Sequence, residues 1–363
     1  MSHPDRREHE RTRPGIHRRT VVDMAAFRSS PNKRVLLVMP YHQLTRKAAE
    51  AGFHVWSLWD PELPEADLLD RVEHASEGLL LTGFGDEAGL RRLVERTAYR
   101  HGIGAVVHCG SGASVLPVVE EAWRLGLSPN PPSAIAGLRA RREPASVGGP
   151  RLTVQTLTVD GAHRVVGVAV QRTSGPPDHR VTGHLFPAPL SDSERAGAEN
   201  AVLELLRGSG YRFGPASAEV QLTEDGPRVL CCVPRFGPDR LPLLAQAASG
   251  FDVEAALFAA LLGDEVPGAQ PAQRYAEIGF FALPEGQLLT YTGTEDIAVT
   301  PWVRGARFPY RPGDRIPPPA DPRTRRAYVL VVGGSPEETQ ERIRRARGDL
   351  VTDIRGVADG TRG

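Results

Sequence analysis

The sequence predicts a two-part protein, a doubly wound α/β domain followed by an α+β domain, and three observations lead to this prediction. Short apolar runs alternate with segments of helical period through the first third of the chain, a pattern typical of a parallel sheet covered by helices. Prolines and glycines concentrate in residues 128–150 and interrupt that alternation. Beyond them, turn residues separate β-rich runs that can pair as antiparallel hairpins.

The first domain is predicted at residues 34–130. Continuous apolar runs indicate strands buried on both faces, and they occur at 35–39, 53–58, 79–81 and 105–107. A helix is predicted after each strand, and the last helix follows the turn Gly110-Ser111-Gly112. A turn before a helix N-terminus suits anions, but this one lacks the third glycine of the dinucleotide-binding motif. We therefore interpret it as a tight turn that packs helix on strand.

A linker is predicted at residues 131–151 and the second domain at residues 152–350. Asp160-Gly161 between two β-rich runs is a strong hairpin signal, and Ser191 with Glu194 forms a capping box that begins a helix. The further elements predicted in this domain are a hairpin at 218–233, an apolar helix at 251–262, a β-rich stretch at 275–332 and a polar helix at 337–347.

Both ends of the chain are predicted to lie outside these domains. Residues 1–33 form a basic tail that we expect to be disordered, because they are rich in arginine and have no apolar segment of the kind that a signal peptide needs. Residues 351–363 are predicted as a flexible tail.

Composition narrows the range of functions. Lys plus Arg and Asp plus Glu both number 44, and the resulting zero net charge argues against nucleic-acid binding through bulk positive charge. The absence of a run of 18 apolar residues excludes a transmembrane helix. The three cysteines have neither disulfide-framework nor zinc-site spacing, so a reducing cytoplasm fits best. Only Lys33 and Lys47 are lysines, a bias typical of GC-rich bacterial genomes, and chemistry that needs a lysine must use one of them.

The second domain carries a series of motifs in a characteristic order. They are Gly183-His184-Leu185-Phe186-Pro187-Ala188-Pro189-Leu190, Gly210-Tyr211-Arg212-Phe213-Gly214-Pro215, Ala218-Glu219-Val220, Thr223-Glu224-Asp225-Gly226-Pro227 and Pro234-Arg235. This series resembles the C-terminal subdomain of the ATP-grasp carboxylate–amine ligases, and the first domain resembles their pre-ATP-grasp domain. The resemblance covers most of residues 34–347.

The resemblance implies a metal site that this chain has partly lost. In that family, two acidic residues on adjacent strands, and an Asn two residues after the second, hold the Mg²⁺ ions that bridge the phosphates of ATP. The first position matches Glu219, whereas the second falls on Cys231 and the Asn position on Val233. A thiol and an isopropyl group do not supply the oxygen ligands that Mg²⁺ prefers. We therefore expect Glu219 to be a vestigial metal ligand.

Arg235, the basic residue of the same motif, lies near phosphate or the substrate carboxylate in the family. Glu219 and Arg235 are the candidate substrate-binding residues, and the two side chains are expected to pair across adjacent strands of one hairpin. Cys231 and Cys232 are neighbours in a strand, so one thiol should face the cleft and the other the core. His101, His108, His179 and His184 lack metal-site spacing and are expected to be surface or capping residues.

The resemblance also implies that the central nucleotide-binding subdomain is largely missing. The family places there the strands on the adenine side, two phosphate-facing lysines and a glycine-rich loop. Here residues 142–151 occupy that place, and no lysine follows Lys47. Phosphoryl transfer depends on positioned cations around the phosphates. We therefore expect no catalytic residues and no cofactor.

The favoured function is a catalytically degenerate, ligase-like protein of a bacterial biosynthetic pathway that acts as a binding or scaffold subunit. Its expected partner is an intact ligase or another pathway enzyme, and a homodimer stays open; neither nucleic acid nor a membrane is expected. The alternative is an active ATP-dependent carboxylate–amine ligase that uses ATP and Mg²⁺ and completes its site with a partner chain or an altered nucleotide mode. A third hypothesis is a small-molecule binder that kept only the carboxylate pocket around Arg235.

Overall fold

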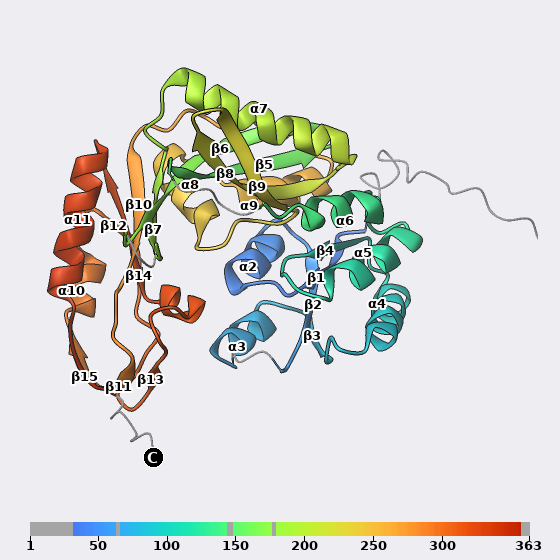
Figure 1. Ribbon diagram of the computed structural model, residues 1–363. Coiled ribbons are helices and arrows are strands. Elements are labelled where there is room, and N and C mark those ends of the chain that lie inside the picture. Colours follow the sequence, from blue (N-terminus) through green and yellow to red (C-terminus); the bar gives the residue numbers. More distant parts are fainter. Residues whose placement is uncertain (1–31, 63–65, 144–147, 176–178, 357–363) are drawn as a thin grey trace, which may run out of the picture.

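The computed structural model (Figure 1) describes residues 32–62, 66–143, 148–175 and 179–356. Residues 1–31 of the predicted N-terminal tail and 357–363 of the predicted C-terminal tail lie outside the described residues.

The first domain is a four-stranded parallel sheet with the strand order β3-β2-β1-β4. The strands are β1 (Arg34–Val38), β2 (His54–Trp59), β3 (Gly78–Leu81) and β4 (Ala105–His108). The helices are α2 (His42–Glu50), α3 (Ala66–His74), α4 (Glu87–His101) and α5 (Val115–Arg124). The predicted alternation of strand and helix is confirmed throughout this domain.

Burial on both faces explains why β1 is a continuous apolar run. Val35 and Leu37 pack into a core that contains residues of α2 and of the second domain. Leu36 and Val38 point the other way, into a core with α4 and α5. Because successive side chains of a strand point to opposite faces, neither face of this strand can be polar.

The second domain is built on an eight-stranded antiparallel sheet with the order β12-β14-β10-β7-β6-β5-β8-β9. Its strands are β5 (Arg151–Val159), β6 (Ala162–Thr173), β7 (Val181–Phe186), β8 (Gly214–Thr223), β9 (Gly226–Val233), β10 (Tyr275–Phe280), β12 (Val303–Arg307) and β14 (Tyr328–Gly333). A smaller antiparallel sheet has the order β13-β11-β15. Its strands are β11 (Gly286–Thr292), β13 (Arg315–Ile316) and β15 (Val351–Arg355).

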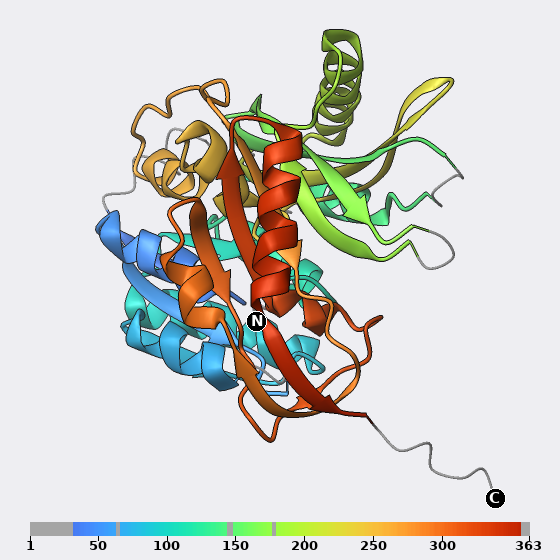
Figure 2. The same ribbon diagram turned by 90° about the vertical axis from the view of Figure 1, so that its left-hand side faces the viewer.

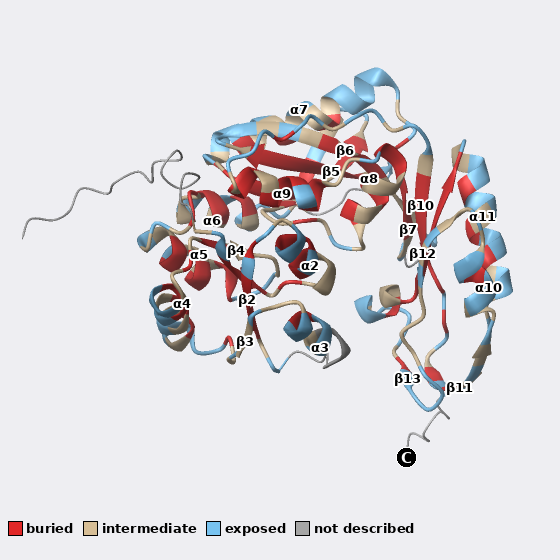
Figure 3. Ribbon diagram, turned by 180° about the vertical axis from the view of Figure 1, so that it is seen from behind, coloured by how far each residue is buried: buried red, intermediate tan, exposed pale blue. Residues whose placement is uncertain are grey.

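Helices cover both faces of the large sheet. They are α7 (Asp192–Ser209), α8 (Leu241–Ser249), α9 (Val253–Leu261), α10 (Thr294–Val299) and α11 (Pro336–Asp349), together with the short 3-10 helix η1 (Pro322–Arg326). The capping box predicted at Ser191 and Glu194 begins α7. Figure 2 shows α11 lying in front of the neighbouring strands of the large sheet and running roughly along them. In Figure 3 α9 is mostly buried, whereas α7, α10 and α11 each expose one face.

Within the described residues, no single helix is long and apolar enough to cross a membrane. The pair α8 and α9 passes that test only together, and the two helices are bent by 100° at the break between them. Both helices contribute to the core that joins the two domains.

Two predicted boundaries are wrong. Residues 351–355, predicted as the start of a flexible tail, form β15, because they pair with β11 along its length. The predicted linker contains a complete helix, α6 (Pro132–Ala140), which buries Ile135 and Leu138 against the core beneath α7. Pairing with a distant strand and packing against a distant helix are not visible in the local sequence pattern.

The connection between the domains is short. After α6, Arg142 forms an isolated antiparallel bridge with Cys231 of β9, and the Glu143 N–H donates to the Leu230 carbonyl (2.8 Å). The chain then enters β5 at Arg151. In the described part of this connection, 141–143 and 148–150, no strand longer than that bridge occurs.

A buried ion pair fixes the first domain against the second. Lys47 of α2 donates from Nζ to Asp252 (2.6 Å) and Glu254 (2.7 Å) at the start of α9. Tyr41 and Gln43 also donate to the Glu254 carboxylate. The side chains of Lys47 and Glu254 are only 8% and 3% exposed, so each charge depends on the other for compensation.

We predict that Lys47→Met destabilises the protein by about 3–5 kcal/mol, because it leaves buried carboxylates without their cation. The neighbouring Arg46 pairs with Glu50 on the exposed side of the same helix, and Arg46→Met should change stability by less than about 0.5 kcal/mol. Urea unfolding of both variants checks this. Equal losses in the two variants would show that the buried pair does not hold the domains together.

Candidate functional site

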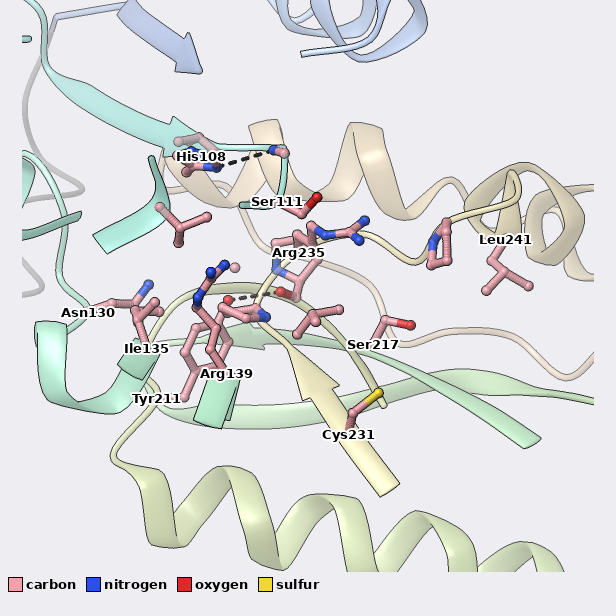
Figure 4. Close-up of a pocket in the computed structure, with 18 of the residues that line it drawn as sticks. His108, Ser111, Asn130, Ile135, Arg139, Tyr211, Ser217, Cys231, Arg235 and Leu241 are labelled. Carbon is pink, nitrogen blue, oxygen red and sulfur yellow. Dashed lines mark hydrogen bonds between the residues drawn. The ribbon is translucent and has the colours of Figure 1, made fainter. Parts of the chain in front are cut away.

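A cavity of about 480 Å³ lies between the two domains. The end of β4 and the following loop form one side, α6 and the connection another, and the open face of β5, β8 and β9 the floor (Figure 4). Its polar lining consists of His108, Ser111, Ser128, Asn130, Arg139, Arg142, Thr153, Gln171, His184, Tyr211, Ser217, Glu219, Cys231, Arg235, Asp239 and Arg325. The cavity therefore brings together Glu219 and Arg235, the two candidate binding residues found in the sequence.

Strand alternation decides which residues of β8 and β9 face the cavity. Glu219 and Cys231 are register partners and both line it. Cys232 points away, is 1% exposed and packs in the core under α7. The prediction that one thiol faces the cleft and the other the core is confirmed.

The expected pair between Glu219 and Arg235 is wrong. Within the described residues no ion pair joins them, and Arg235 donates from Nη1 to the Phe236 carbonyl instead (3.1 Å). Burial, and then the charge of Arg139, lowers the pKa of Arg235. Arg235 follows the end of β9, so its direction depends on the turn after that strand rather than on strand alternation.

Glu219, Cys231 and Val233, which line the cavity, occupy the positions where the resemblance implies metal ligands. Burial, and then the neighbouring Glu219 carboxylate, raise the pKa of the Cys231 thiol, and sulfur is not among the oxygen ligands that Mg²⁺ prefers. Among the described residues, no group of three His, Cys, Asp or Glu side chains gathers as a metal site would require. The oxygen ligands that Mg²⁺ prefers are thus not assembled around Glu219.

His184 corrects an expectation. It was predicted at the surface or at a cap, yet it is 2% exposed on β7 and its Nε2 lies 3.1 Å from Asp239 Oδ2. Arg325 donates to the same oxygen (2.6 Å). His184 Nδ1 is buried and has no hydrogen-bond partner in the described structure. The sequence signal for the burial of His184 is its place inside the motif 183–190. The spacing of the histidines tests only for a metal site and does not indicate burial.

His108 holds the turn that precedes α5. Its Nδ1 accepts from the Gly110 N–H (3.2 Å) and its Nε2 lies 3.1 Å from Ser114 Oγ. A Cβ on Gly110 would lie 2.7 Å from Met39 Cβ, so only glycine fits this close approach. The tight-turn interpretation of Gly110-Ser111-Gly112 is confirmed, and His108, predicted as a surface or capping residue, contacts this turn and the N-cap residue of α5.

Comparisons with known proteins agree with the family resemblance that the sequence motifs indicate. Residues 279–355 match the family model described as L-amino acid ligase C-terminal domain 2. The uncharacterized protein y4rH of Sinorhizobium fredii (strain NBRC 101917 / NGR234) is 31% identical over 198 residues, which are 52% of this chain and 41% of that protein. The match thus spans about two fifths of the relative's length.

Two solved structures share the fold over most of the chain. The L-amino acid ligase from Bacillus licheniformis has a TM-score of 0.76 and 17% identity and covers 90% of this chain and 99% of its own. Phosphoribosylglycinamide synthetase from Anaerococcus prevotii has a TM-score of 0.74 and 10% identity and covers 89% of this chain and 100% of its own.

The fold is therefore that of the ATP-grasp ligases, and the predicted resemblance to the carboxylate–amine ligases of this class is confirmed.

We predict that acid destabilises the protein partly through His108. Burial, then the charges of Arg139 and Arg235, lower its pKa to about 3, against about 6.5 in the unfolded chain. Below pH 6.5 the His108 imidazole is protonated in the unfolded chain but stays neutral in the folded protein. The free energy of unfolding therefore falls between pH 6.5 and 3, by at most about 1.4 kcal/mol per pH unit. Urea unfolding at several pH values should show a shallower fall for His108→Gln. His54→Gln, at an exposed position, is the control, and an unchanged slope in His108→Gln would contradict the prediction.

We also predict that Arg235→Met changes stability by less than about 1 kcal/mol, because no carboxylate is left unpaired and the apolar stem is retained. Arg325→Met is the matched comparison, since it removes a partner of Asp239, whose side chain is only 10% exposed, and it should destabilise by about 2 kcal/mol or more. Thermal and urea unfolding measure both. If Arg235→Met lowers the free energy of unfolding more than Arg325→Met does, the prediction is wrong and Arg235 has a structural pairing role.

Proposed function

We propose that this protein is a catalytically degenerate member of the ATP-grasp ligase class that binds a ligand in its interdomain cavity. It acts as a binding or scaffold subunit beside an intact ligase or another enzyme of a bacterial biosynthetic pathway, in the cytoplasm. The observation that carries the proposal is the chemistry at the floor of the cavity. A protonated Cys231 and an apolar Val233 stand where the class implies oxygen ligands for Mg²⁺.

The placement of the two lysines supports the proposal. Lys47 is enclosed by the carboxylates of Asp252 and Glu254 at the domain contact, and Lys33 is exposed before β1. Neither lines the cavity. Phosphoryl transfer relies on cations positioned at the phosphates, and neither lysine supplies one here.

The short connection between α6 and β5 is a second support. We attribute it to loss of the central nucleotide-binding subdomain, since residues 141–143 lie directly against the edge of β9. That edge is where an additional subdomain would have to enter the sheet. A cleft without the central subdomain leaves the adenine and phosphates of ATP exposed to water, and water weakens every electrostatic contact to them.

The alternative is an active ATP-dependent carboxylate–amine ligase that completes its site with a partner chain. The observation that favours it is the likeness to the L-amino acid ligase from Bacillus licheniformis over nearly all of that chain. Under this alternative Glu219 and Arg235 would contact metal and substrate, and ATP with Mg²⁺ would bind once the partner is present.

We predict that the protein alone does not bind Mg-ATP at about 1 mM. Calorimetric titration should give no saturable heat, and the melting temperature should not rise with nucleotide, because binding to the folded state alone would stabilise it. A dissociation constant below about 100 μM, or roughly −5.5 kcal/mol, would contradict the proposed function.

The control is Cys231→Asp combined with Val233→Asn, which places two oxygen ligands beside Glu219. The added carboxylate repels Glu219, so Mg²⁺ should raise the melting temperature of this variant and leave the wild type unchanged.

A further inference from the structure

Arg139, Arg142 and Arg235 line the same cavity, and none of the three takes part in an ion pair in the described structure. Where these side chains have an acceptor among the described residues, it is a backbone carbonyl. Arg139 donates to the Gly112 carbonyl (2.7 Å) and Arg235 to the Phe236 carbonyl (3.1 Å). A guanidinium has five N–H donors, so most donors of these three groups remain available to a ligand.

The backbone contacts of the connection between the domains orient the Arg142 side chain toward the cavity. Its backbone bridges to Cys231, and the next residue, Glu143, is held by the Leu230 carbonyl and by the Arg228 side chain (2.7 Å). Neighbouring residues of an extended chain point to opposite sides. Arg142 therefore lines the cavity beside Cys231, whereas Arg141 does not line it and donates to the Val229 carbonyl (3.3 Å).

Carboxylates do not balance these charges. Asp239 is already engaged by Arg325 and His184, which leaves Glu219 as the cavity carboxylate opposite three guanidinium groups. Burial and then Arg142 lower the pKa of Arg139, while burial and then Arg139 lower the pKa of Arg235. An anion placed among these cations would relieve both their desolvation and their mutual repulsion.

The rest of the cavity limits the ligand. Val115, Val119, Ile135, Leu257 and Leu261 supply an apolar wall, and the volume is about 480 Å³. Figure 4 places Arg139, Arg235 and Ser111 around one part of the cavity, with Ile135 beside them. A small molecule with a charged head and an apolar body matches this division.

We propose that Arg139 and Arg142, together with Arg235, form an oxyanion-binding site that needs no divalent metal. Its ligand is a small organic carboxylate or phosphate monoester with an apolar body, held by bidentate guanidinium contacts. This inference rests on the proposed function, in which the cavity binds a ligand without activating it by ATP. It names the ligand class and assigns two of the three cations, Arg139 and Arg142, to α6 and the connection that follows it.

The test is calorimetric titration of the full chain in EDTA with three probes: inorganic phosphate, phenyl phosphate and N-acetyl-leucine. The expected result is saturable binding of phenyl phosphate or N-acetyl-leucine, tighter than that of inorganic phosphate because of the apolar wall. The arm that binds more tightly identifies the head group as phosphate or carboxylate. Arg139→Gln and Arg142→Gln should each weaken binding about tenfold or more, since each removes charged hydrogen bonds to the anion.

Arg141→Gln is the matched control, because it removes the same charge from the neighbouring residue outside the cavity. Its affinity should equal that of the wild type. The inference is overturned if no probe binds in EDTA, if binding requires Mg²⁺, or if Arg142→Gln and Arg141→Gln behave alike.

Failure of this inference can be told from failure of the proposed function. Saturable binding of Mg-ATP would overturn the proposed function, and the titrations in EDTA do not depend on that result. Absence of oxyanion binding together with absence of Mg-ATP binding would overturn this inference alone.

Discussion

Lys47 contributes the contact on which the cavity depends. Its ammonium lies between the carboxylates of Asp252 and Glu254, where removal from water is tolerated only because both partners are held at hydrogen-bond distance. Tyr41 and Gln43 complete the shell around Glu254, and the apolar residues of one face of the parallel sheet continue into the core of α8 and α9. The two domains thus share one core and one charged contact, which fixes the distance between the loop after β4 and the floor formed by β8 and β9.

The connection between the domains serves three physical purposes at once. It closes the edge of β9, whose backbone groups would otherwise stay unpaired, through the bridge from Arg142 to Cys231. The ion pair of Glu143 with Arg228 anchors it there. With α6, it also brings two guanidinium groups to a cavity whose floor contains a thiol and an isopropyl group. The positive charge of this cavity thereby comes from arginines that are part of the fold.

The charges in the cavity fall into two groups with different consequences. Asp239, Arg325 and His184 compensate one another in one corner, and that cluster stabilises the turn after β9. Arg139, Arg142 and Arg235 have no such compensation in the described residues. Partial burial of Arg139 and Arg235 without a carboxylate partner has a cost in stability, and this imbalance is the physical basis for assigning ligand binding to the second group.

The sequence by itself determined the order of strands and helices, because apolar runs, turn dipeptides and capping residues act over a few neighbours. It also determined that one of Cys231 and Cys232 faces the cleft and the other the core, since strand alternation is a local rule. Only the tertiary structure decided that β15 pairs with β11, that His184 is buried against Asp239, and that Arg235 turns away from Glu219. These outcomes depend on groups between 16 and 68 positions apart, brought together by packing that no local pattern records.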